Sequence, residues 1–228
     1  MNLSVFEVMG PVMVGPSSSH TAGAVRIGNV AVMALGEPIA QISFGLHGSF
    51  LQTGLGHGTY CALLAGAMGL RPDDERIAQA FLLAQERGVR YSFHAQRLKN
   101  AHENSVLVTA KGKSGILKKI IASSIGGGRI GIDSIDGFSM GISAELPTVI
   151  VGHLDSPGVI CEITGVFARN GVNIAAMKVS RAARGMRACC IIETDSTVTQ
   201  KMFEPLIDGV RIFSACVLQP VTGECTNV

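Results

Sequence analysis

The segment Thr148-Val149-Ile150-Val151-Gly152-His153-Leu154, followed by the turn Asp155-Ser156-Pro157-Gly158, decides how the C-terminal third of the chain folds. The first seven residues are rich in β-branched side chains, which favour a strand. The turn places a proline where a helix can begin. Apolar residues then recur at helical spacing from Val159 to Phe167, and Asn170-Gly171 ends the pattern. We therefore expect a strand followed by a helix.

The remaining C-terminal residues complete a compact pattern. We expect a strand over 172–182, a hairpin turn at Arg184-Gly185, a strand over 186–193, a helix over 195–208 bent at Pro205, and a last strand over 211–217. The order βαββαβ within about 75 residues is that of a ferredoxin-like domain. We assign this domain to residues 148–220. It contains no constellation of residues typical of an enzyme.

The residues upstream have a different composition and end in a stretch that we interpret as a linker, Ser143-Ala144-Glu145-Leu146-Pro147. They predict an α/β (α+β) domain over residues 1–145. The expected elements are a helical turn over 3–9, helices from Ser18 or Ser19 to Leu35, over 60–70 and over 72–85, strands over 38–44, 89–94, 105–111 and 116–124, and a turn at 133–137.

The turn that opens the first long helix carries an unusual run of polar side chains: Gly15-Pro16-Ser17-Ser18-Ser19-His20-Thr21-Ala22-Gly23. A helix N-terminus needs one hydroxyl as a cap, because a Ser or Thr oxygen accepts an otherwise unpaired N–H. The same end attracts anions. Three serines, a histidine and a threonine exceed the needs of a cap. The run is therefore a candidate anion-binding or catalytic turn, and the alternative is a richly decorated cap.

A second glycine-rich loop follows the first strand of this domain. It reads His47-Gly48-Ser49-Phe50-Leu51-Gln52-Thr53-Gly54-Leu55-Gly56-His57-Gly58-Thr59 and precedes an apolar helix. Glycines allow a ligand to approach the backbone, and a helix N-terminus suits a carboxylate or phosphate. The loop lacks the G-K-[ST] of a nucleotide-binding loop and the dinucleotide fingerprint. His57, between two glycines, is either a functional imidazole or a surface histidine.

A third glycine run, Ser124-Ile125-Gly126-Gly127-Gly128, ends the strand over 116–124. Consecutive glycines weaken a strand and mark either a close approach to a ligand or a bulge or wide turn. Neither alternative is excluded by the sequence.

Composition excludes several classes of function. The 228 residues carry a net charge of +2 without a basic stripe, and there is no Trp and only two Tyr, so nucleic-acid binding is not indicated. No apolar run is long enough for a membrane span, and the N-terminus lacks the basic flank of a secretion signal, so we expect a cytoplasmic protein. The six cysteines show no metal-ligand spacing; we expect no metal site on this chain and reduced, mostly buried thiols.

The serine-rich turn, His47-Gly48-Ser49-Phe50, the loop from Thr53 to Thr59 and the Ser124–Gly128 run occur in one order along the chain. Together they closely resemble the β-subunit of iron–sulfur-dependent L-serine dehydratase (L-serine ammonia-lyase). Residues 148–220 resemble an ACT domain, a regulatory module.

The resemblance implies an enzyme of two chains that converts L-serine to pyruvate and ammonia. Its [4Fe-4S] cluster is expected on an α-subunit, where an open iron acts as a Lewis acid on the leaving hydroxyl. The resemblance implies His57 and His20 as catalytic residues, either one as the base. It implies substrate contacts from Ser17, Ser18, Ser19, Thr21, Gly54, Gly58, Thr59, His102, Asn104 and Gly127. It also implies an ACT effector site at Asp155, Gly158, Asn173 and Ile174, and a homodimer contact through the ACT or β domain.

The sequence departs from the family pattern at two places. Glu103, between His102 and Asn104, and Ser105, directly after Asn104, stand where Pro and Thr are usual. Tyr60 stands where Asp commonly follows G-H-G-T. A second hypothesis is a non-catalytic, amino-acid-binding regulatory module. Acyl transfer by a Ser–His pair is disfavoured, because no G-x-S-x-G elbow is present.

Overall fold

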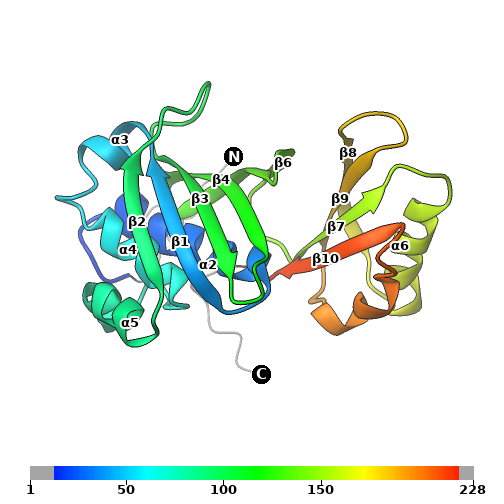
Figure 1. Cartoon of the computed structure of the whole chain (residues 1–228), viewed down its shortest axis with the longest axis horizontal. Coiled ribbons are helices and arrows are strands. Elements are labelled where there is room, and N and C mark those ends of the chain that lie inside the picture. The colour runs from blue at the N-terminus through cyan, green and yellow to red at the C-terminus, as the bar shows by residue number, and fades with distance from the viewer. Residues whose placement is uncertain (1–12, 221–228) are drawn as a thin grey trace, which may run out of the picture. The chain divides into compact units, whose positions relative to one another are not determined.

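The computed structural model describes residues 13–220, which divide into two compact units that meet in sequence near residues 138–144 (Figure 1). A six-stranded sheet organises the first unit and a four-stranded sheet the second. The helical turn predicted over residues 3–9 lies outside the described residues.

The helices of the first unit begin with an uncommon turn. The π-helix η1 (Ser18–Gly23) continues directly into α2 (Ala24–Leu35), so the predicted helix ends where expected. The other helical segments are α3 (Gly48–Gln52), α4 (Thr59–Ala67), the 3₁₀ turn η2 (Glu75–Gln79) and α5 (Ala80–Glu86). The helix predicted over 72–85 is thus half 3₁₀. The short helix α3 was not predicted, because a five-residue helix depends on tertiary contacts rather than on its own propensity.

The six-stranded sheet has the order β2-β1-β3-β4-β5-β6. Its strands are β1 (Ile39–Leu46), β2 (Arg90–Ala95), β3 (Ser105–Gly112), β4 (Leu117–Gly126), β5 (Arg129–Ile135) and β6 (Phe138–Ile142). β2 pairs with β1 in parallel, because the helices α3 to α5 form the crossover between them, whereas β3, β4 and β5 follow as antiparallel neighbours. The sequence did not predict β5 and β6. The turn predicted over 133–137 is confined to Asp136-Gly137, where both φ angles are positive.

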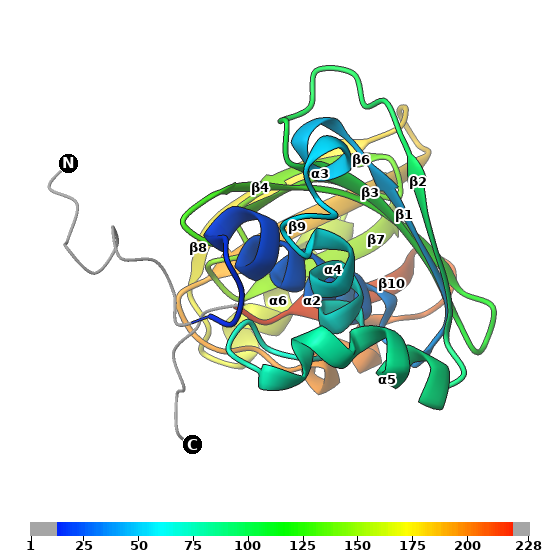
Figure 2. The ribbon, with the colours of Figure 1, turned by 90° about the vertical axis from the view of Figure 1, so that its left-hand side faces the viewer.

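One face of this sheet forms the core of the first unit. Its alternating side chains are fully buried: Ile42, Phe44, Val106, Val108, Ile120 and Ala122. Helices α2 and α4 lie on this face, inside the curve of the sheet (Figure 2). The two helices approach each other closely, because a Cβ on Gly66 would lie only 1.9 Å from the Val25 carbonyl oxygen.

The strand register places three loops at the same end of the neighbouring strands β1, β3 and β4. Leu46, at the end of β1, is paired with Val106, and Ser105, at the start of β3, is paired with Ser123 near the end of β4. The segments after β1, before β3 and after β4 are therefore neighbours. These segments carry the glycine–histidine loop, His102–Asn104 and the glycine run.

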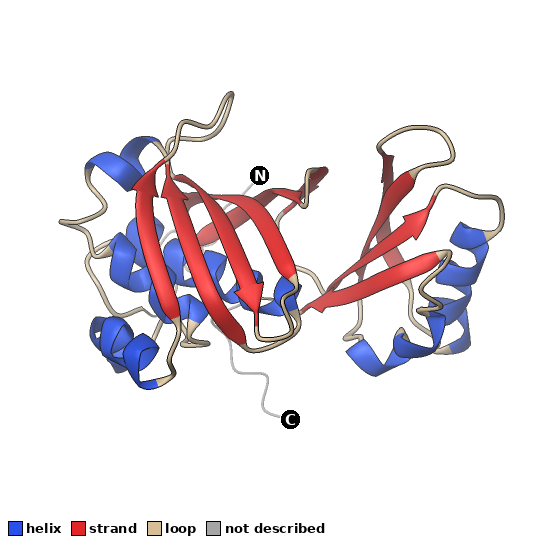
Figure 3. Cartoon of the chain, viewed as in Figure 1, coloured by secondary structure: helices blue, strands red, loops and turns tan. Residues whose placement is uncertain are grey.

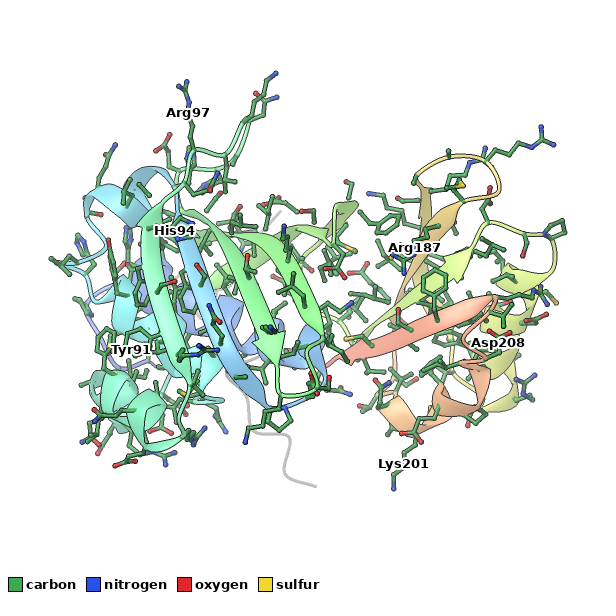
Figure 4. The ribbon with its side chains drawn as sticks, in the orientation of Figure 1. Tyr91, His94, Arg97, Arg187, Lys201 and Asp208 are labelled. Carbon is green, nitrogen blue, oxygen red and sulfur yellow. The ribbon has the colours of Figure 1, made fainter. Side chains whose placement is uncertain are left out.

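The second unit has the predicted ferredoxin-like topology. Its elements are β7 (Thr148–Leu154), α6 (Val159–Arg169), β8 (Ile174–Arg181), β9 (Arg187–Thr194), the 3₁₀ turns η3 (Gln200–Met202) and η4 (Glu204–Leu206), and β10 (Ile212–Leu218). The antiparallel order β10-β7-β9-β8 places the first and third strands at the centre. Helix α6 lies on one side of this sheet (Figure 3). Arg187 lies over the Phe213 ring, 4.9 Å from its centroid (Figure 4).

The helix predicted over 195–208 is wrong, because only the two short 3₁₀ turns form there. Pro205 lacks an N–H and disfavours helical backbone at the residue before it. The segment is anchored by packing instead. Phe203 is fully buried, and its ring centroid lies 5.2 Å from that of Phe167 on α6. The Asp208 carboxylate accepts three backbone N–H groups, which lowers its pKa and fixes the turn into β10.

The expectation that the cysteines are mostly buried is wrong for the described residues. Cys189 and Cys190 are buried, Cys61 and Cys216 are half-buried, and Cys161 is exposed on α6. None of these five described cysteines forms a disulfide, and Cys225 lies outside the described residues. Among the described helices, none is long and apolar enough to cross a membrane.

Candidate functional site

The serine-rich turn folds as a capped π-turn. Ser17 has extended backbone, and its hydroxyl accepts the His20 N–H at 3.1 Å while its carbonyl accepts the Thr21 N–H at 2.8 Å. Ser17 is therefore the N-cap of the helix. Ser18 and Ser19 are half-buried in the first turn, and Thr21 is buried. The turn carries the cap and, three residues later, an imidazole.

The imidazole of His20 contacts three side chains of the next glycine-rich segment. His20 Nε2 lies 3.2 Å from Ser49 Oγ and 3.1 Å from Thr53 Oγ1, and these two hydroxyls are 3.2 Å apart. The ring meets the edge of Phe50, with centroids 5.4 Å apart. Helix α3 brings Ser49 and Thr53 to one side, because residues four apart lie on the same helical face.

His57 lies beside His20, with ring centroids 4.9 Å apart. Its Nδ1 is 3.0 Å from the Thr53 carbonyl oxygen. A carbonyl oxygen only accepts, so Nδ1 carries the proton in this contact. In the neutral ring the lone pair is then on Nε2, on an exposed side chain. This arrangement leaves a basic nitrogen at the surface of the site.

The electrostatics of the pair favour one neutral ring. Partial burial lowers the pKa of His20 below its usual 6.5, and the neighbouring charge of His57 lowers it further, against an opposing hydrogen bond to the Ser49 backbone. Two imidazolium rings this close repel each other. His20 therefore stays neutral at neutral pH.

The loop between α3 and α4 is held by hydrogen bonds within the loop and by one from Thr21. The Thr59 N–H bonds the Gly54 carbonyl at 2.8 Å, and the Thr21 hydroxyl donates to the His57 carbonyl at 3.3 Å. A Cβ on Gly54 would lie 2.1 Å from the Phe50 carbonyl oxygen, so only glycine fits there. Gly58, with φ of 71°, precedes α4. The Thr59 hydroxyl is buried without a hydrogen-bond partner among the described residues.

The segment with His102 and Asn104 joins the site through its backbone. The Ser49 N–H bonds the Glu103 carbonyl at 2.8 Å, and the Ser124 N–H bonds the Asn104 carbonyl at 2.9 Å. The exposed His102 accepts the Asn104 N–H on its Nδ1. This contact turns the ring toward its own backbone.

Gly127 lies in the exposed turn between β4 and β5, with φ of 62°. The glycine run therefore ends β4 with a register shift between Ser124 and Gly126 and a two-residue turn into β5, and its approach to a ligand stays a prediction. The Arg26 guanidinium donates to the next carbonyl, of Gly128, at 2.8 Å. This bond ties the turn to α2.

The structure thus brings His20, His57, Thr21, Gly54 and Thr59 together and leaves His102 and Gly127 at the periphery. Sequence reasoning did not assign Ser49, Thr53 and Phe50, which contact His20. The spacing of two hydroxyls four residues apart, within the loop that carries His57, was the available indication.

Within the described residues, no group of three or more His, Cys, Asp or Glu side chains is arranged to hold a metal ion. The cysteines there do not offer the thiolate set that a [4Fe-4S] cluster needs. The described part of this chain therefore does not fit the cluster.

The four candidate effector residues of the second unit lie at two ends of its sheet. Asp155 accepts the Gly185 N–H and pairs with Arg181, and these contacts lower its pKa. Asn173 donates instead to Asp195, near the start of β8. The eight-residue strand β8, roughly 23 Å long, separates the two ends. Gly158 belongs with Asp155, at the start of α6, and the half-buried Ile174 with Asn173.

Comparison with known proteins assigns both units. A family model described as serine dehydratase beta chain matches residues 4–90, and an ACT domain model matches residues 148–206. The L-serine dehydratase beta chain of Peptoniphilus asaccharolyticus is 38% identical over 92% of this chain and 95% of its own length. A "Probable L-serine dehydratase, beta chain" of Bacillus subtilis is 37% identical over 89% and 92%. An "L-serine dehydratase" of Mycobacterium bovis is 30% identical over 86% of this chain but 44% of its own length.

These similarities extend over nearly the whole length of two beta chains. The chain belongs to the serine dehydratase beta chain family, with a C-terminal ACT domain.

Proposed function

We propose that this chain is the β-subunit of an L-serine ammonia-lyase, which converts L-serine to pyruvate and ammonia together with an α-subunit that carries a [4Fe-4S] cluster. The relatives named as L-serine dehydratase beta chains support the reaction class. One observation in this chain carries the proposal: the Thr53 carbonyl holds the Nδ1 proton of His57 and leaves an exposed, basic Nε2.

His57 is the base in this proposal. Its Nε2 takes the α-proton of serine, and the Nδ1–H···O=C bond fixes the ring while the positive charge forms. The neutral His20, 4.9 Å away, does not oppose that charge. The hydroxyls of Ser49 and Thr53 hold His20 in place.

The helix N-terminus at Ser17–Thr21 supplies the anion-binding group. The N–H groups of the first turn and the helix dipole favour the substrate carboxylate. Loss of the α-proton and of the β-hydroxyl, which leaves with a proton as water, gives an enamine. The enamine tautomerises to an imine, and water then releases pyruvate and ammonia.

The test is anaerobic pyruvate formation from L-serine by the co-expressed two-chain enzyme. We expect His57→Ala to lower kcat by roughly 10²- to 10⁴-fold, the usual contribution of a general base. His94→Ala is the matched control, since His94 is an exposed imidazole on β2 that bonds Ser43 instead (Figure 4). Wild-type turnover in His57→Ala would remove His57 from the mechanism. Wild-type turnover with both His57 and His20 replaced would overturn the catalytic role of the site.

The ACT domain supports a second role, the binding of a small-molecule effector. Calorimetry of the full chain without an α-subunit separates the two roles. Tight L-serine binding that survives His57→Ala and is lost in Asp155→Ala would indicate an effector site. Binding that depends on the α-subunit would indicate the catalytic site alone. Sedimentation of the same sample tests the proposed homodimer.

A further inference from the structure

A leucine stands at the tip of the loop that carries His57. Leu55 is 82% exposed and lies between Gly54 and Gly56. The segment between α3 and α4 projects outward at the left of Figure 1. A single exposed leucine is ordinary on a protein surface. The loop that carries Leu55, however, is not an ordinary surface loop.

The loop holds Leu55 in a fixed position. Its bonds run from the His57 N–H to the Thr53 carbonyl, from the Gly58 N–H to the Leu55 carbonyl and from the Thr59 N–H to the Gly54 carbonyl. The buried Thr21 fastens the loop from outside through the His57 carbonyl. A large apolar side chain on an ordered loop loses little conformational freedom when it is buried by a partner, which is the property of an interface anchor.

Two more apolar side chains are exposed at the same end of the sheet, where β1 and β4 end. Leu51, on α3, is 38% exposed, and Ile125, at the end of β4, is 44% exposed. Backbone hydrogen bonds join the segments that carry them, from the Ser49 N–H to the Glu103 carbonyl and from the Ser124 N–H to the Asn104 carbonyl. We call Leu51, Leu55 and Ile125 the apolar rim. Exposed apolar side chains beside a polar site are a feature of protein interfaces.

The site inside this rim is chemically incomplete. The groups that contact the two imidazoles, among the described residues, are hydroxyls, backbone groups and an aromatic ring. Within residues 13–220, no carboxylate is hydrogen-bonded to the imidazole of His20 or His57 to receive a substrate ammonium group. The missing groups fit a second protein surface, and the Mycobacterium bovis relative has the room for one, because the region matched by this chain is 44% of its length.

We propose that the apolar rim is the docking surface for the α-subunit, the chain that would correspond to the unmatched part of such longer relatives, and that Leu55 is its anchor. The inference rests on the proposed function for the identity of the partner. Docking there closes the surface over His57 and excludes water from the proton transfer.

The experiment measures association of the tagged, co-expressed α-subunit with this chain, and not turnover. Leu55→Asp is expected to weaken association at least tenfold, because a charge replaces a buried apolar anchor. The matched control is Leu82→Asp, since Leu82 is 52% exposed on α5. It should associate like the wild type. Leu55→Ala, which adds no charge, should weaken association less than Leu55→Asp, and circular dichroism of each variant verifies folding.

Wild-type association of Leu55→Asp would overturn the docking proposal, as would loss of association in Leu82→Asp alone. The outcome is separable from that of the proposed function. A wild-type complex that forms, depends on Leu55 and makes no pyruvate would refute the reaction while supporting the docking surface. A His57→Ala complex that assembles normally and is inactive would support both.

Discussion

The two units of this chain position their predicted functional residues in opposite ways. In the first unit, Thr21 and His57 are 36 residues apart in sequence yet share a hydrogen bond. In the second unit, Asp155 and Asn173 are closer in sequence but occupy opposite ends of the sheet, separated by β8. An amino acid is too small to contact both ends. The first unit thus gathers its candidate residues in one place, whereas the second holds its candidate residues in two separate groups.

Topology explains the difference. In the first unit the crossover from β1 to β2 returns the loop over 53–58 to the N-terminus of the first helix. In the second unit the helix α6 carries the chain from one end of the sheet to the other, so the residues before and after it cannot meet. The cysteines Cys61 on α4 and Cys190 on β9 offer a separate reporter of opening in each unit.

The largest effect is expected from Phe203→Ala in the second unit. The change removes a fully buried ring packed on Phe167 and should cost about 3–5 kcal/mol of stability. Burial raises the pKa of the Cys190 thiol to about 12, so alkylation of this thiol requires opening of the unit. The alkylation rate of Cys190 in this variant should rise by roughly 100-fold or more, because each loss of about 1.4 kcal/mol of stability raises the open population tenfold.

Alkylation of Cys61, in the first unit, should stay at the wild-type rate in Phe203→Ala. Lys201→Ala, on an exposed neighbour labelled in Figure 4, is the control and should change neither rate. Equal acceleration at Cys61 and Cys190 would contradict the independence of the two units.

Gly54→Ala is expected to speed the alkylation of Cys61 and to leave that of Cys190 unchanged. The new Cβ would lie 2.1 Å from the Phe50 carbonyl oxygen, so the loop must shift, at a cost of about 1–3 kcal/mol. Cys61, whose thiol donates to the Ile77 carbonyl and whose pKa is raised by burial, should then be alkylated faster. Cys190 should be unaffected, and pyruvate formation should fall steeply because His57 moves with the loop.

Gly56→Ala is the matched control for the loop. A Cβ there would lie 3.7 Å from the Thr53 carbonyl oxygen, an ordinary contact. The variant should keep both activity and stability. If Gly54→Ala and Gly56→Ala behave alike, the loop geometry described above is not the one that the protein uses.

A smaller effect concerns the pH dependence of stability. The pKa of His20 is lowered in the folded state, so the unfolded chain binds its proton first. The contribution of His20 to the free energy of unfolding is therefore fully present above pH 6.5. It is lost as the pH falls through the lowered folded-state pKa. Denaturant titrations from pH 7 to pH 5 should show a shallower loss of stability in His20→Gln than in the wild type. A change of the same size in His94→Gln would contradict the assignment to His20.

Sequence patterns predicted the parts of this molecule that depend on local chemistry. The β-branched run from Thr148 to Leu154 formed its strand, and the breaks at Asn170-Gly171 ended α6. The patterns failed where tertiary contacts decide. Helix α3 depends on the bond from Ser49 to Glu103, and the segment around Phe203 is fixed by its packing on Phe167 rather than by helical propensity.

The same distinction applies to the site. His20 and His57 could be selected as candidates because they lie in glycine-rich, polar turns, and loops often carry functional residues. Their catalytic role stays a prediction. The contacts of Ser49 and Thr53 with His20 join residues about 30 apart and follow only from the fold. The tautomer of His57 likewise depends on a carbonyl whose position no sequence pattern predicts.

The most direct test of His57 as the base is to determine which ring nitrogen carries the proton in the full chain. Nitrogen-15 NMR correlations of the neutral imidazole ring measure this. The Thr53 carbonyl at 3.0 Å predicts that Nδ1 carries the proton and that Nε2 is the free base. His57→Gln identifies the signals. A His57 ring protonated on Nε2, with Nδ1 unprotonated, would contradict the proposed base and the geometry that supports it.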